Sequence, residues 1–180
     1  MNQSLNKPYK KSINTNRNQI KEKKKKIEYS SKKENDNERE MITKEIIKTI
    51  EKSKNGLHEY KVRPLVEDTE KFSDHLKKYG LKTNHLRRFL DSLKQLKARL
   101  AKTGKIEDIQ DDLYFLQPQL AFAAARKKQE MRKGDSLNPA QDFCNVVTAG
   151  IKKVHSEKDF YRLVQLVEAI IAYHKAAGGD

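Results

Sequence analysis

From Pro64 onward the apolar positions recur at intervals of three and four residues, the spacing of helices that bury one face. The clearest example follows Thr83, which is expected to cap it, and stops at Gly104. Its apolar stripe consists of Leu86, Phe89, Leu90, Leu93, Leu96 and Leu100. Glycines, prolines and a capping serine divide the remainder into further segments. The expected helices cover 64–80, 83–104, 106–128, 139–153 and 156–177. The pattern therefore predicts an all-α fold, a compact bundle of about five helices.

Two of these segments carry apolar residues around more than one face. The segment from Ser156 is apolar more than halfway round, which is typical of a central helix. The segment from Ile106 has Leu113, Leu116, Leu120 and Ala124 on one side and Phe115 and Phe122 on the other. We expect that helix to be buried on both faces. Pro118 lies inside it and, lacking a backbone donor, is expected to kink or divide it.

The first 63 residues have little to bury. Their sequence is rich in Asn, Ser and Lys, and ordering such a chain costs about 1–2 kcal/mol per residue in backbone entropy. We expect residues 1–63 to be a disordered basic arm. Ile42, Ile46 and Ile50 could form a short helix over 41–53, although it would be too short to be stable alone. The folded helical domain is expected to cover residues 64–180.

The charge of the chain indicates the kind of partner that it binds. The chain has 39 Lys and Arg against 25 Asp and Glu, a net charge of +14, which favours a polyanionic partner. A composition set by an AT-rich genome is the alternative explanation. The face of the 83–104 helix opposite its apolar stripe carries five cations with only Asp91 to balance them, namely Arg87, Arg88, Lys94, Arg99 and Lys102. The alanine-rich segment also ends in cations, at Arg126, Lys127, Lys128, Arg132 and Lys133. Phosphate contacts or a solubility face would both explain these clusters.

Catalytic chemistry is not indicated by the sequence. The lone cysteine, Cys144, sits among apolar residues and is expected to be a buried, inert thiol. The five histidines are scattered without metal-ligand spacing, and His174 falls in an apolar stripe as a packed histidine would. No cofactor or metal is therefore expected. The absence of a long apolar run and of a secretory leader predicts a soluble, cytoplasmic protein.

Three stretches together resemble a known family. "LKTNHLRRFLDSL" (81–93), "LQPQLAFAAARK" (116–127) and "FYRLVQLVEAIIAYHKAAGG" (160–179) are similar to the small α-helical subunit of type III-A (Csm-type) CRISPR effector complexes. The run from Glu168 to Lys175 with its trailing glycine pair is the most specific part. Gln119 and Ala125 stand where the family usually has Lys and Gly.

That resemblance implies a non-catalytic subunit that stacks with copies of itself and lines the channel for guide RNA and target RNA. Its partners would be the backbone and large subunits of the complex. Matching positions make Arg87, Arg88 and Arg126 the RNA contacts that the resemblance supports. Charge alone adds the other candidates, which are Lys94, Lys127, Lys128 and Arg132.

Two other functions are compatible with the same sequence. A helical protein-interaction adaptor would use the flat alanine faces and keep the basic face for solubility. A metal-dependent nuclease would need a divalent-cation site in the acidic patch Glu107, Asp108, Asp111 and Asp112.

Overall fold

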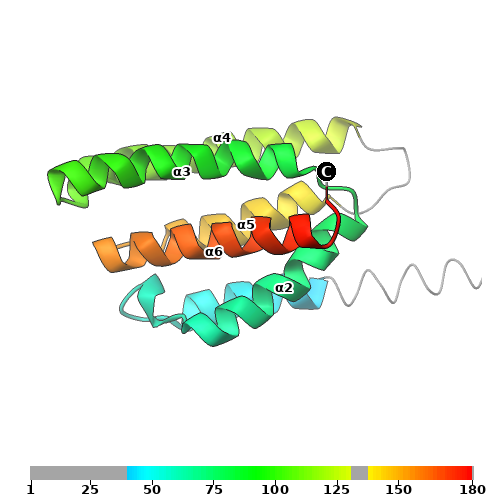
Figure 1. The fold of residues 1–180 in the computed structure, drawn as a ribbon, viewed down its shortest axis with the longest axis horizontal. Coiled ribbons are helices and arrows are strands. Elements are labelled where there is room, and N and C mark those ends of the chain that lie inside the picture. The colour runs from blue at the N-terminus through cyan, green and yellow to red at the C-terminus, as the bar shows by residue number, and fades with distance from the viewer. Residues whose placement is uncertain (1–39, 131–137, 180) are drawn as a thin grey trace, which may run out of the picture. The chain divides into compact units, whose positions relative to one another are not determined.

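The computed structural model describes residues 40–130 and 138–179, and these residues are almost entirely helical (Figure 1). No strand occurs among them, so the all-α prediction is confirmed. A helix over residues 40–52 and a short 3-10 turn, η1 (Leu57–Glu59), precede the long helices. The long helices are α2 (Val62–Lys78), α3 (Thr83–Thr103), α4 (Glu107–Glu130), α5 (Pro139–Ile151) and α6 (Glu157–Ala176). The expected basic arm lies largely outside the described residues, since nothing before residue 40 is described.

The folded unit begins earlier than the sequence indicated. Its compact part starts at Glu40 rather than at Pro64. Ile46 and Ile50 of the 40–52 helix are fully buried, and so are Leu57 and Tyr60 after it. A helix that is too short to be stable alone is stabilised here by burying its apolar face in the shared core. A backbone bond of 2.9 Å from Leu57 N to Lys153 O also ties this segment to the chain just after α5.

Helix α6 is the centre of the bundle, as predicted from the apolar residues that cover more than half of its circumference. It packs against α2, α3, α5 and η1 (Figure 1). Phe160, Leu163, Val167 and Ile170 are buried along it. A buried hydrogen bond of 2.9 Å from Ser73 Oγ to Ile170 O joins it to α2.

Local signals explain most helix ends. Gly80 follows α2 with a φ of 74°, and the amide of Leu81 bonds to Leu76 O while that of Gly80 bonds to Lys77 O. This pattern satisfies the last carbonyls of the helix and favours glycine at the left-handed position. At α6, the Ser156 side chain accepts the amide of Asp159, which confirms the predicted cap. Pro139 opens α5 after the cap Asn138, also as predicted.

One local prediction was wrong, and at a second place one of the two expected outcomes does not occur. Thr83 does not cap α3 but is its first residue, and its hydroxyl lies 3.1 Å from His174 Nδ1 instead. Pro118 does not divide α4, which continues through it to Glu130 and past Ala125 without a break. Proline removes only one backbone bond of a long helix, and the packing of α4 on α3 and α5 holds the helix together.

Candidate nucleic-acid interface

A hollow of about 300 Å³ between α3 and α4 brings together three of the basic residues singled out from the sequence. Arg88 comes from α3, while Arg126 and Lys127 come from the last turns of α4. Arg88 and Arg126 are exposed and Lys127 is half-buried. The remaining lining residues are Phe89, Ser92, Gln119, Leu120, Phe122 and Ala123, so no acidic side chain lines the hollow among the described residues.

The backbone beneath these cations is held in place by buried contacts. Phe89, next to Arg88, packs edge-on against Phe143 of α5 with the ring centroids 5.9 Å apart. Two residues before Arg126, the carbonyl of Ala124 accepts a bond of 2.8 Å from Asn138 Nδ2 at the start of α5. Helix α5 therefore fixes both sides of the hollow, and the guanidinium groups extend from a rigid base.

Farther along the same two helices the surface is neutralised. A second hollow of about 290 Å³ is lined by Arg99, Asp112 and Phe115, among others. Arg99 Nη1 lies 2.5 Å from Asp112 Oδ2, and Arg99 Nη2 donates to the carbonyl of Asp108. Arg99 is thus not an unbalanced cation, contrary to the expectation for this face. The sequence missed this pair because its partners lie on different helices.

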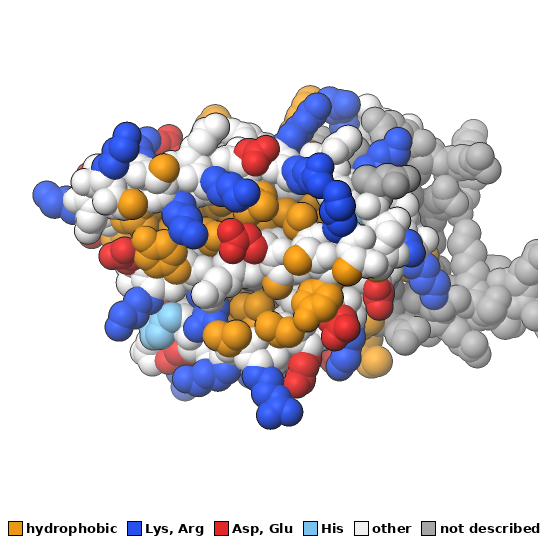
Figure 2. Space-filling view, viewed as in Figure 1, with side chains coloured by type: hydrophobic (Ala, Val, Ile, Leu, Met, Phe, Trp, Pro, Cys, Tyr) orange, Lys and Arg blue, Asp and Glu red, His pale blue; other side chains and the backbone are white. Residues whose placement is uncertain are grey.

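The other predicted basic residues lie outside the hollow. Arg87 and Lys94 are exposed on α3, and the helical rotation of about 100° per residue turns them to a flank away from Arg88. Lys128 is exposed on α4 but does not line the hollow. Arg132 lies outside the described residues. Basic side chains predominate over α3 and α4 at the top of the view in Figure 2.

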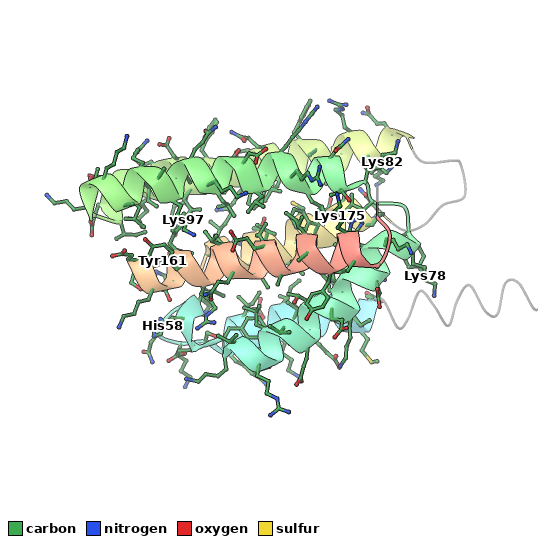
Figure 3. The ribbon with its side chains drawn as sticks, in the orientation of Figure 1. His58, Lys78, Lys82, Lys97, Tyr161 and Lys175 are labelled. Atoms are coloured by element: carbon green, nitrogen blue, oxygen red, sulfur yellow. The ribbon has the colours of Figure 1, made fainter. Side chains whose placement is uncertain are left out.

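Lys97 shows that not every lysine of α3 is available to a ligand. Its side chain is half-buried, and its Nζ lies 5.7 Å from the centroid of the Tyr161 ring of α6, toward which it points in Figure 3. At the end of the unit opposite to Lys97 and Tyr161, α2 and α6 end and α3 begins (Figure 3). The lysines exposed there are Lys78, Lys82 and Lys175.

The aromatic residues of α4 were assigned to the wrong environment by the sequence. Phe115 and Phe122 are 66% and 67% exposed, because the packing of α4 on α3 and α5 buries one face, which contains Leu113, Leu116, Leu120 and Ala124. The expectation of a helix buried on two faces was therefore wrong. A signal was present in the polar neighbours, because Gln119 and Arg126 share the row of Phe122 at spacings of three and four residues.

The buried titratable groups have structural roles. His174 is fully buried; burial lowers the pKa of its imidazole, the Lys77 charge acts in the same direction, and a hydrogen bond with the Leu81 backbone opposes them. The backbone of Gly179 packs against the His174 ring, where a Cβ would also lie 2.7 Å from the His174 carbonyl oxygen. Burial raises the pKa of the Cys144 thiol. Both residues are packed as the sequence predicted.

Neither a metal site nor a membrane span is found in the described part of the chain. Among residues 40–130 and 138–179, no three His, Cys, Asp or Glu side chains are grouped so that they could hold a metal ion. Within the same ranges, every helix is too short or too polar to cross a bilayer.

A family model described as Csm2 Type III-A matches residues 59–180. The match begins close to η1 and includes α2 through α6, and with them both helices that form the hollow. No curated protein and no solved structure gives a significant match to the chain.

Proposed function

The chain belongs to the Csm2 type III-A family, subunits of type III-A CRISPR effector complexes, and on this premise we propose that it is a non-catalytic subunit that holds RNA in the α3–α4 hollow. The RNA would be the guide and its target in the cytoplasmic complex. Copies of the chain would stack along that RNA beside the backbone and large subunits.

The observation that carries the proposal is the convergence of Arg88, Arg126 and Lys127 in one hollow, whose described lining contains no acidic side chain. Arginine presents a planar set of donors that suits phosphate oxygens, and several such contacts on a rigid base fix the register of a strand. Because counterions are released when phosphates are neutralised, the binding should weaken as salt is added. Phosphate contacts carry no sequence information, so we expect little discrimination among RNA sequences.

The test is a titration of the full chain against labelled single-stranded RNA and a guide–target duplex at two salt concentrations. The full chain is needed because the core includes residues before Pro64. We expect the Arg88→Glu/Arg126→Glu variant to bind both RNAs about tenfold or more weakly, with a salt slope that is smaller by about 2. Fluorescence anisotropy gives the affinities, and circular dichroism verifies the helical fold.

A matched control is Arg63→Glu/Lys71→Glu, which makes the same change in net charge. Both residues are exposed on α2, a helix that packs on α6 and α5 rather than on α3 or α4. This control should change the affinity about twofold at most. Equal weakening in the two variants would mean that net charge alone attracts the RNA, and the hollow would not be the site.

The second candidate is a protein-interaction adaptor, and the exposure of Phe115 and Phe122 favours it. Large exposed apolar side chains on an unpaired helix face are typical of protein interfaces. An adaptor predicts that the Arg88→Glu/Arg126→Glu variant still assembles into the effector complex and that wild-type protein shows no salt-sensitive RNA binding.

A further inference from the structure

Phe122 is a large apolar side chain placed in the basic hollow between α3 and α4. Its ring is 67% exposed and lines the hollow together with Arg88, Arg126 and Lys127. A single exposed phenylalanine needs no explanation by itself. The position of Phe122 does need an explanation, because two arginines lie beside it. Arg126 lies one helical turn farther on the same face of α4, and Arg88 lines the hollow from α3. The ring is therefore bordered by cations from two helices.

A ligand that suits both features must carry negative charge and a flat apolar face at short spacing. Single-stranded nucleic acid has both, since each phosphate is followed by a base with an exposed π-face. A duplex has the negative charge but no exposed base faces, since its bases are stacked on one another. An acidic peptide would satisfy the cations but offers an aromatic face only at occasional positions.

We propose that Phe122 is a stacking platform for one unpaired RNA base, with Arg88 and Arg126 holding the phosphates on either side of it. This proposal rests on the proposed RNA-binding function and names the part of the RNA that the hollow takes. Gln119 and Ser92 line the same hollow. An amide and a hydroxyl both donate and accept, so they can bond to the edge of any base, and the site is tolerant of sequence.

Phe115 provides an internal comparison on the same helix. It lies seven residues before Phe122, so the two rings lie on the same face two turns apart, and it is equally exposed at 66%. The arginine of its hollow, Arg99, is paired with Asp112. Among the described residues that line its hollow, Phe115 thus has no arginine other than this paired one, and it should not hold a nucleotide.

The chain contains no tryptophan, so Phe122→Trp introduces one fluorophore at the proposed site. Oligouridine should quench its emission along the same saturation curve that anisotropy gives for binding. Phe115→Trp should show little quenching. Phe122→Ala should weaken oligouridine binding about tenfold, Phe122→Tyr should preserve it, and Phe115→Ala should change it about twofold at most.

An abasic ribose-phosphate strand separates stacking from phosphate contact. Phe122→Ala should leave the affinity for this strand and for the duplex unchanged, whereas Arg88→Glu/Arg126→Glu should weaken both. An equal loss on the abasic strand, or binding without quenching of Phe122→Trp, would overturn the stacking while leaving the phosphate-binding function in place. If wild-type protein binds no RNA, both proposals fail.

Sedimentation of the same variants tests whether a second protein molecule, rather than RNA, covers Phe122. If Phe122→Ala dissociates copies of the chain and leaves RNA affinity intact, the ring packs against a second protein molecule. That result would also overturn the proposal.

Discussion

Replacing Asp159 with alanine is expected to lower the free energy of unfolding by about 3 kcal/mol. The side chain is only 1% exposed. Its Oδ1 accepts bonds from the backbone N–H of His58 at 2.8 Å and from the His58 ring at 2.6 Å. Its Oδ2 accepts bonds from the amide of His155 at 3.1 Å and from Ser156 Oγ at 2.7 Å. Alanine would leave these donors without their partner, including two backbone amides. Urea denaturation followed by circular dichroism measures the loss.

The matched control is Asp91→Ala, which removes an exposed carboxylate from α3 and should change stability by about 0.5 kcal/mol at most. If Asp159→Ala were no more destabilising than this control, the carboxylate would not connect the segment before α2 to the start of α6.

The same carboxylate gives the effect a pH dependence. Burial raises the pKa of Asp159, but the bonds from His58, Ser156 and His155 lower it more strongly, to about 2. A depressed pKa stabilises the fold above the pKa of the unfolded state, near 3.9, and this stabilisation, about 2 kcal/mol, is lost as pH falls toward 2. The stability gap between wild type and Asp159→Ala should therefore narrow between about pH 4 and pH 2.

Gly56→Ala is expected to cost about 3 kcal/mol, through the same cluster. Gly56 has a φ of 130°, a conformation that L side chains rarely adopt. A Cβ there would lie 2.6 Å from Asp159 Oδ2 and 2.7 Å from Asp159 Cγ. The methyl group would thus add a clash with the buried carboxylate to the backbone strain. Thermal or urea unfolding of the variant gives the magnitude.

Gly104→Ala separates these two costs. Gly104 also has a positive φ, 65°, but nothing lies within 4 Å of the position that its Cβ would take. It should cost only the left-handed backbone penalty, about 1 kcal/mol. Similar losses of stability in Gly56→Ala and Gly104→Ala would show that the Asp159 carboxylate moves aside without cost. Backbone strain alone would then explain the effect at Gly56.

The elements that could be predicted from the sequence are those set by neighbours in the chain. The caps at Ser156 and Gly80 and the start at Pro139 act within a single turn, so short windows of sequence contain them. The central place of α6 was also predictable, because a helix that is apolar more than halfway round needs neighbours on several sides.

The elements that were missed depend on which helices meet. Phe122 was assigned to the core because apolar spacing shows that a face could be buried, but not that a partner covers it. Arg99 was counted as unbalanced because Asp112 reaches it from another helix. Arg87 and Arg88 were equal candidates in the sequence, and only the placement of α4 brings Arg88 together with Arg126. His58 and Asp159 are 101 residues apart, with no local signal to join them.

The central position of α6 also determines when the protein can fold during synthesis. Helices α2 and α3 rest on α6 rather than on each other, so they leave the ribosome before the surface that covers their leucines exists. Their apolar faces are exposed during that interval, which is the state in which nascent chains associate or recruit chaperones. The bundle therefore closes only after α6 has emerged, rather than helix by helix.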